Sequence, residues 1–401
     1  MKVLQINTVC EKGSTGKIAV SINNYIVEQQ STGMIAFGAK SSSYDYSYKI
    51  GGKLNYYYHN IMSRIFGNEG LYSVIATKKL LKFIESYKPD IIHLHNLHGH
   101  YINIRILFDY IKLKKIPIIW TFHDCWSFTG KCTHFDYAKC FKWQKLCYKC
   151  PQLSSYPASI FDNSKKNFLE KRAVFTGVEK MVLVSPSKWL AELTRDSYLK
   201  DYPVKVINNG IDTNIFKPTM FNNEELKKKI EDKYVVLGVS NPWTSSKGFD
   251  DFLKIADYFN EEKNIIFIMV GLNDRQLYSM PENVIGLKKT NSSNELAMIY
   301  SKADIFINPT YDDNYPTVNL EAVACGTPVI TYNTGGSGEF IKEHNAGNVV
   351  KKGSFKDLIE SIKAYYTKNK KITISKKTID SLDNSLYKEY LNIYKETLKR
   401  N

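Results

Sequence analysis

The sequence predicts an α/β protein built from two Rossmann-like, doubly wound domains that face each other across an interdomain cleft. Its 401 residues are about two to three times the common domain size. Short apolar runs alternate with amphipathic stretches along nearly the whole chain, which is typical of a parallel sheet wrapped by helices. The alternation restarts after about residue 203. Ligands of such folds bind at the carboxyl ends of the strands, so the site is expected between the domains.

The first domain is expected to span residues 1–202 and to include a cysteine-rich loop at 125–150. Its predicted strands are Val3–Asn7, Ile91–Leu94, Ile116–Phe122 and Met181–Val184. Each is a short apolar run bounded by polar or turn-forming residues, which indicates a buried parallel strand.

The second domain is expected to span residues 203–382. Its predicted strands are Tyr234–Val239, Ile265–Val270, Ile305–Asn308 and Pro328–Thr331, with helices near Phe249–Phe259, Asn294–Tyr300 and Leu320–Ala324. Residues 383–401 should form a C-terminal helix that packs back on one domain. The apolar residues of this segment recur at helical spacing: Leu386, Tyr390, Ile393, Tyr394 and Leu398.

Charge is distributed unevenly along the chain, whose net charge is +15. Residues 1–200 carry 28 Lys and Arg against 14 Asp and Glu, whereas residues 201–401 carry 27 against 26. The first domain should therefore meet an anionic partner, either a phosphorylated substrate or an anionic membrane surface. Lys dominates over Arg, which disfavours nucleic acid as the partner.

The apolar runs are shorter than the roughly 20 residues of a membrane span. Polar Gln5 and Asn7 interrupt the N-terminus before the apolar core of a signal peptide could form. These features favour a cytoplasmic protein, with peripheral attachment to the inner face of the plasma membrane as an option.

A glycine-bearing turn follows the first predicted strand and opens a helix, so backbone N–H groups and the helix dipole can face an anion. Its spacing departs from a P-loop, which needs four residues between its glycines and Ser or Thr after Lys. The GxGxxG fingerprint of dinucleotide-binding folds is also absent. The residues expected to line the acceptor side are Gly13, Ser14, Gly16 and Lys17.

A histidine cluster follows two neighbouring strands, where α/β sites form. Catalysis and metal binding are both compatible with it, but hydrogen-bonded structural roles are the commoner use of His93, His98 and His100. His123 differs, because Asp124 and the end of a strand place it at the expected cleft.

Four cysteines lie within nineteen residues, and the last two form a Cys-x-x-Cys knuckle. A reducing compartment disfavours disulfides, so a structural zinc site with four thiolates is one interpretation and four metal-free thiols are the other. The residues concerned are Cys132, Cys140, Cys147 and Cys150.

Two strand–loop–helix segments carry the candidate residues of the second domain. Lys247 lies at a helix start, where a diphosphate could meet both its charge and the helix dipole. Asp313 and Glu321 bracket another helix N-terminus, whose free N–H groups near Thr317 and Val318 suit phosphate oxygens. After the next strand, a glycine-containing turn at Thr334–Glu339 again leads into a predicted helix.

Together these motifs resemble the retaining glycosyltransferases of family 4, which have the GT-B fold. The resemblance runs from the turn at Gly13 through the segments Val206–Asp212 and Phe216–Pro218 to Gly335-Gly336, nearly the whole chain. The segments Gly-Ser-Thr-Gly-Lys, Thr-Phe-His-Asp-Cys-Trp-Ser-Phe-Thr-Gly-Lys-Cys and Cys-Pro-Gln-Leu are similar to a subgroup active in exopolysaccharide, colanic-acid-type and O-antigen synthesis.

The resemblance implies a donor site in which Lys247 binds the diphosphate of a nucleotide sugar, Glu321 its ribose, and His123 the sugar. The family has Glu at the position of Asp313, and the shorter side chain weakens the expected sugar contact; Asp312 is a possible substitute. The family also has Arg before the diphosphate Lys, where this chain has the segment Ser240–Pro242.

The expected function is transfer of a sugar, with retention of configuration, from a UDP- or GDP-linked donor to a glycan acceptor on undecaprenyl pyrophosphate. Lys247 and the amides near Thr317 would stabilise the leaving diphosphate, so catalysis should need no metal cofactor. Tyrosines 56–58 could contribute to the acceptor side. The alternatives are a nucleotide-sugar epimerase and a non-catalytic glycan- or membrane-binding protein on the same scaffold.

Overall fold

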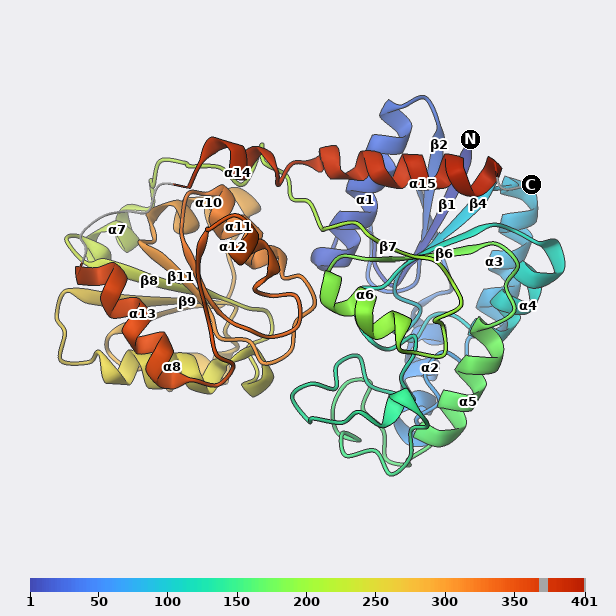
Figure 1. The fold of residues 1–401 in the computed structure, drawn as a ribbon, viewed down its shortest axis with the longest axis horizontal. Coiled ribbons are helices and arrows are strands. Elements are labelled where there is room, and N and C mark those ends of the chain that lie inside the picture. Colours follow the sequence, from blue (N-terminus) through green and yellow to red (C-terminus); the bar gives the residue numbers. More distant parts are fainter. Residues whose placement is uncertain (368–373, 400–401) are drawn as a thin grey trace. The chain divides into compact units, whose positions relative to one another are not determined.

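A computed structural model describes residues 1–367 and 374–399, which form two compact units (Figure 1). The first unit combines Met1–Asn208 with the C-terminal segment from Ser385, and the second is Asn209–Asn384. Residues 368–373 and 400–401, which fall in the predicted second domain and C-terminal helix, lie outside the described residues.

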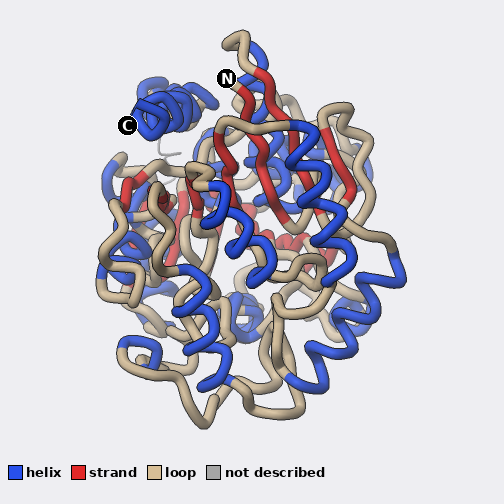
Figure 2. Tube along the Cα trace, turned by 90° about the vertical axis from the view of Figure 1, so that its right-hand side faces the viewer, coloured by secondary structure: helices blue, strands red, loops and turns tan. Residues whose placement is uncertain are grey.

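The first unit contains a parallel sheet of seven strands in the order β3-β2-β1-β4-β5-β6-β7. Figure 2, with this unit toward the viewer, shows its strands among covering helices. The strands are β1 (Lys2–Asn7), β2 (Thr32–Phe37), β3 (Ser47–Lys49), β4 (Ile91–Leu94), β5 (Ile118–Thr121), β6 (Met181–Ser185) and β7 (Val204–Val206). The helices are α1 (Gly13–Glu28), α2 (Lys53–Phe66), α3 (Val74–Tyr87), α4 (Ile104–Lys114), η1 (Lys142–Gln144), α5 (Ser164–Phe175), α6 (Lys188–Arg195) and α15 (Lys388–Lys399).

The second unit contains a parallel sheet of six strands in the order β10-β9-β8-β11-β12-β13. The strands are β8 (Tyr234–Val239), β9 (Ile265–Val270), β10 (Val284–Leu287), β11 (Ile305–Asn308), β12 (Val329–Tyr332) and β13 (Gly347–Val350). The helices are α7 (Glu224–Ile230), η2 (Ser245–Lys247), α8 (Phe249–Tyr258), α9 (Asp274–Leu277), α10 (Ser293–Lys302), α11 (Thr317–Ala324), α12 (Glu339–Glu343), α13 (Phe355–Thr367) and α14 (Lys376–Asp380). The short helix η3 (Asn384–Tyr387) begins at the last residue of this unit and continues into the first unit.

Both sheets confirm the predicted α/β class with two doubly wound units. Their central strands are buried on both faces, which is why these strands read as continuous apolar runs in the sequence. In the first unit β1, β4 and β5 are neighbours, so the residues that follow them lie at one edge of the sheet.

The limits of the units differ from the predicted ones. β7 pairs with β6, so the first unit continues to Asn208 instead of ending at residue 202. The C-terminal helix α15, red in Figure 1, packs on the first unit. Its Tyr390, Ile393 and Tyr394 share an apolar cluster with Val3 of β1 and with helix α1.

Candidate functional site

Lys247 is held at the turn that follows β8. Thr244 caps this turn by accepting a hydrogen bond from the Lys247 N–H at 3.3 Å. Gly248 ends it with φ of +77°, and a Cβ there would lie 2.1 Å from the Pro309 carbonyl oxygen. Only glycine tolerates both constraints, so Gly248 keeps Lys247 close against the end of β11.

The Lys247 ammonium already has two oxygen partners. Its Nζ donates to the Asp313 carboxylate at 2.7 Å and to the Asp312 carbonyl at 2.9 Å. The Lys247 and Asp313 side chains remain 31% and 21% exposed, so a ligand can reach the pair. Asp313 is therefore the counterion of Lys247, a relationship that sequence spacing could not show because 65 residues separate the two in the chain.

Asp312, the suggested substitute for Asp313, is buried. Its carbonyl oxygen accepts from both Thr310 and Lys247. Asp312 therefore shapes this loop through its backbone, beside the partly exposed carboxylate of Asp313.

Helix α11 begins at Thr317, four residues after Asp313, and no side chain caps its N-terminus. The Thr317 and Val318 residues are partly exposed. Uncapped N–H groups and the helix dipole together attract an anion. The loop before α11 thus presents the Asp313 carboxylate, with the Lys247 ammonium bound to it, and a helix N-terminus.

The glycine turn before α12 lies against the start of α11. Asn319 donates to both the carbonyl and the hydroxyl of Ser337, at 3.0 and 3.2 Å. Asn319 also accepts from Asn308 at 2.8 Å, and Ser337 bonds with Thr331 at 2.8 Å. This buried network ties the ends of β11 and β12 to the α11 N-terminus.

Glu321 lies one turn into α11 and is partly exposed. Its carboxylate accepts a hydrogen bond from the Tyr300 hydroxyl at 3.2 Å. Tyr300 is fully buried, and its burial next to Glu321 raises the pKa of the phenol well above its usual value. Tyr300 therefore stays a donor that orients the Glu321 carboxylate.

The first unit presents an uncapped helix N-terminus of its own. α1 begins at Gly13, after Lys12, and no side chain caps it. Gly13, Ser14 and Lys17 are exposed, whereas Gly16 is buried, where a Cβ would come within 3.2 Å of the Glu11 backbone nitrogen. The predicted acceptor-side residues thus surround a helix start open to an anion.

His123 follows β5 and is partly buried. Its Nε2 lies 3.0 Å from Nδ1 of His95, and both rings line a small cavity at the end of the sheet. Burial lowers the pKa of His123 to about 4, so the ring is neutral near pH 7.

The carboxylate next to His123 in the sequence has another partner. Asp124 lies 2.7 Å from Nε2 of His98 and accepts from the Trp126 backbone N–H at 2.8 Å. His98 also contacts the Tyr156 hydroxyl at 3.0 Å. The partner of His123 among these groups is His95, which sequence reasoning did not single out.

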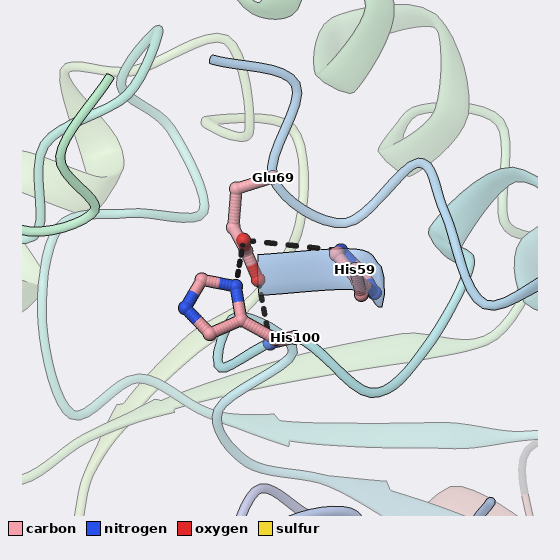
Figure 3. Close-up of side chains that lie close together, drawn as sticks. All are labelled: His59, Glu69 and His100. Atoms are coloured by element: carbon pink, nitrogen blue, oxygen red, sulfur yellow. Dashed lines mark hydrogen bonds and ion pairs between the residues drawn. The ribbon is translucent and has the colours of Figure 1, made fainter. Parts of the chain in front are cut away.

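Glu69 is the buried centre of a second histidine cluster (Figure 3). One carboxylate oxygen accepts from the backbone N–H groups of Gly99 and His100, both at 2.8 Å. The other accepts from Ser63 at 2.7 Å and lies 2.6 Å from Nδ1 of His100 and 3.8 Å from Nε2 of His59. These contacts hold the pKa of Glu69 far below its usual value despite burial.

Among residues 1–367 and 374–399, the metal-ligating side chains whose donor atoms lie within 4.8 Å of one another are His59, Glu69 and His100. Both nitrogens of His59 have partners, Ser73 at 2.7 Å and the Gly70 N–H at 3.3 Å. With its oxygens shared among Gly99, His100 and Ser63, Glu69 acts as a clamp on the loop after β4 rather than as an open ligand set.

The four cysteines of the loop are free thiols. The Gly130 N–H donates to Sγ of Cys147 at 3.2 Å. Burial, together with a smaller contribution from the Cys150 thiol, raises the pKa of Cys132 to about 12 and that of Cys147 to about 11. The thiols influence one another, but in the described residues they do not form a group within 4.8 Å.

Two buried lysines lie near these thiols. Lys131 donates to the backbone carbonyls of Gln152, Leu153 and Ser155 at 3.0 to 3.3 Å. Lys171 donates to the Trp126 carbonyl and stands 4.0 Å above the Trp126 ring. Burial lowers the pKa of Lys171 to about 7, while the nearby Cys147 and Cys132 oppose this shift.

Two Rossmann-like units with helix N-termini, an ammonium and a carboxylate at strand ends are typical of proteins that bind phosphorylated ligands. The comparisons with known proteins specify the class. Residues 43–215 match the model "Glycosyltransferase Family 4", and residues 217–378 match the model "Glycosyl transferases group 1". The chain belongs to the glycosyltransferases of family 4.

The relatives agree with this assignment. The chain is 23% identical over 385 residues, 87% of each chain, to the "Putative colanic acid biosynthesis glycosyl transferase WcaC" of Escherichia coli K12. It is 25% identical over 285 residues to a Campylobacter jejuni N,N'-diacetylbacillosaminyl-diphospho-undecaprenol α-1,3-N-acetylgalactosaminyltransferase, covering 64% of this chain and 73% of that one.

Sucrose-phosphate synthase from Thermosynechococcus elongatus superimposes on the whole chain with a TM-score of 0.74 at 13% identity, with both chains fully covered. This likeness confirms the GT-B fold that the sequence predicted. The protein is a glycosyltransferase, as the motifs predicted. Among the described residues, no helix is long and apolar enough to span a membrane.

Proposed function

We propose that this glycosyltransferase transfers a sugar, with retention of configuration, from a UDP- or GDP-linked donor to a lipid-linked glycan in cell-surface polysaccharide synthesis. The observation that carries the proposal is the contact of Lys247, on the turn after β8, with Asp313, four residues before the uncapped start of α11. A nucleotide diphosphate offers the charge that an ammonium and a helix N-terminus recognise.

In the proposed mechanism, Lys247 and the N–H groups of Thr317 and Val318 stabilise the diphosphate as it leaves. Loss of one such contact can lower the rate by on the order of 10²-fold. Glu321, oriented by Tyr300, accepts hydrogen bonds from the ribose hydroxyls. Asp313 contacts a hydroxyl of the transferred sugar, and His123 of the first unit contacts the same sugar.

Retention of configuration is what the family resemblance implies, and the proposed mechanism needs no protein nucleophile to achieve it. The leaving phosphate takes the proton of the acceptor hydroxyl on the same face of the sugar. The positive charge at Lys247 lowers the cost of building charge on that phosphate.

The acceptor is proposed to carry its glycan on undecaprenyl diphosphate, as the name of the Campylobacter relative describes for that enzyme. The uncapped start of α1 supports this, because Gly13 and Ser14 expose backbone N–H groups beside the exposed Lys17. A diphosphate at this position would interact with both the helix dipole and the lysine.

A membrane-bound acceptor requires the enzyme to work at the bilayer surface, and α2 has a suitable face. Leu54, Tyr57, Tyr58 and Ile61 are 57 to 87% exposed and recur at helical spacing. Exposed Lys53 and Arg64 flank them. An apolar, aromatic face with basic neighbours binds anionic bilayer surfaces, so we place the cytoplasmic protein peripherally on the inner leaflet.

Calorimetric binding of UDP and GDP to the wild type, Lys247→Ala and Glu321→Ala tests the donor site. We expect one nucleotide to bind and both variants to weaken it at least about tenfold, or about 1.4 kcal/mol. No binding of either nucleotide by folded wild type would contradict this site and favour the non-catalytic glycan-binding alternative. Release of free sugar without an acceptor would instead favour the epimerase.

A further inference from the structure

Three side chains form a hydrogen-bonded row at the end of the first unit's sheet. Gln5 lies on β1, His95 directly follows β4, and His123 follows β5. Oε1 of Gln5 lies 2.9 Å from Nε2 of His95, and Nδ1 of His95 lies 3.0 Å from Nε2 of His123. Gln5 is fully buried and His95 is 1% exposed.

A backbone carbonyl determines which atoms donate and which accept in this hydrogen-bonded row. Nε2 of Gln5 lies 2.9 Å from the Ala19 carbonyl oxygen and 3.3 Å from Oδ1 of Asn23. A carbonyl oxygen can only accept, so the amide NH2 of Gln5 must face Ala19. The Gln5 oxygen therefore faces His95, and this oxygen too can only accept.

The protonation of His95 follows from that acceptor. Nε2 of His95 must carry the proton that Gln5 accepts. The ring is buried against His93, with ring centres 4.1 Å apart, and against His123, with centres 5.3 Å apart. Burial, with these two rings as neighbours, holds the pKa of His95 well below its usual value, so the ring is neutral.

A neutral imidazole carries one proton, so Nδ1 of His95 has a lone pair and accepts. Its partner at 3.0 Å, Nε2 of His123, must then donate. On the neutral His123 ring, Nδ1 consequently has no proton and is an acceptor.

We propose that Gln5 and His95 are positioning residues that hold His123 in its Nε2–H tautomer, so that its Nδ1 accepts a hydrogen bond from a hydroxyl of the donor sugar. His123 thus contributes orientation and cannot deliver a proton from Nδ1. The identity of the sugar as partner rests on the proposed function, whereas the tautomer does not.

Nuclear magnetic resonance of protein with 15N-labelled histidine tests the tautomer without any substrate. At pH 7 we expect His123 to carry its proton on Nε2 and to show a coupling across the hydrogen bond to an unprotonated Nδ1 of His95. Loss of signals in His123→Gln and His95→Asn assigns them, and His344→Asn is a control in the second unit. A proton on Nδ1 of His123, or on Nδ1 of His95, would overturn the proposal.

Kinetics of two variants separate positioning from mere packing. His95→Phe fills the space but offers no acceptor, and we expect kcat to fall about tenfold while nucleotide affinity stays within about twofold. His95→Asn can present its amide oxygen close to the original Nδ1 and should recover most of that loss. Equal losses in two folded variants would contradict positioning through the acceptor.

Failure of this inference and failure of the proposed function give different results. If the wild type transfers no sugar but shows the Nε2–H tautomer, the proposed function fails and the histidine assignment stands. If it transfers sugar while His123 carries its proton on Nδ1, the assignment fails alone.

Discussion

The Lys247 ammonium lies 2.7 Å from the Asp313 carboxylate, so the group proposed to bind the diphosphate is already neutralised by an acidic neighbour. A diphosphate must therefore share Lys247 with Asp313. Asp313→Asn removes the competing charge, and we expect UDP or GDP alone to bind about threefold more tightly, by about 0.6 kcal/mol.

Sugar transfer should respond to this change in the opposite direction. We expect kcat of Asp313→Asn to fall at least about tenfold, because the asparagine loses the charged contact to a sugar hydroxyl. Asp313→Glu, which restores the family's residue, should keep kcat within about threefold of wild type. A fall in both affinity and kcat for Asp313→Asn would show that Asp313 mainly holds the loop in place.

Glu69→Gln tests the buried clamp on the loop after β4. The substitution leaves the Gly99 and His100 N–H groups sharing a neutral oxygen and places an amide NH2 against donors such as Ser63. We expect the free energy of unfolding to fall by about 2 to 3 kcal/mol, measured by urea denaturation. Glu360→Gln, which removes an exposed pair with Lys356, is the control and should change it by less than about 0.5 kcal/mol.

His59 gives the first unit an acid sensitivity of predictable sign. Burial lowers the pKa of His59 to about 4 in the folded protein, against 6.5 normally. The folded state therefore binds fewer protons, and stability present above pH 6.5 is lost as the pH falls toward 4. At pH 5 this loss amounts to about 2 kcal/mol for His59 alone.

His59→Gln removes this titrating group, so its free energy of unfolding should decline less between pH 7 and pH 5 than that of the wild type. Denaturation at these two pH values measures the difference. Equal declines in both proteins would mean that His59 titrates normally in the folded state.

The four cysteines of the loop allow a prediction of how much zinc the purified protein contains. A zinc ion with four thiolates carries two net negative charges, which the buried Lys131 and Lys171 could balance, and the N–H bond to Cys147 favours a thiolate. If the four-thiolate interpretation holds, purified protein should contain about one zinc per chain.

Cys147→Ser should lose that zinc, whereas Cys325→Ser, in the second unit, should retain it. Less than about half an equivalent in the wild type would favour four metal-free thiols. Elemental analysis of protein purified without chelator makes the measurement.

The central strands were predictable because burial on both faces imposes an apolar run. β4, β8, β9 and β11 have the predicted bounds. The short edge strands β3 (Ser47–Lys49) and β7 (Val204–Val206) contain lysine and are only partly buried, so their sequences carry no such pattern. Their pairing is decided by the neighbouring strand rather than by their own composition.

The candidate residues were predictable in type and place but not in partnership. Lys247 and His123 were identified as candidates because they lie at a predicted helix start and at a predicted strand end. The sequence used Asp124 and the strand end to place His123 at the expected cleft but assigned it no partner, and the folded chain pairs Asp124 with His98 and His123 with His95. Such pairs join residues 26 and 28 positions apart, so they depend on strand order, which no local pattern encodes.

The packing of α15 on the first unit has a consequence for how this protein can be divided. A fragment ending at Asn208 would lack the tyrosines that cover Val3, Ile18 and Ile22, and would expose that apolar surface to water. The first unit is complete only after the segment from Ser385 has been synthesised. An isolated first unit would therefore have to be built by joining the segment from Ser385 directly to Asn208, as a new covalent connection.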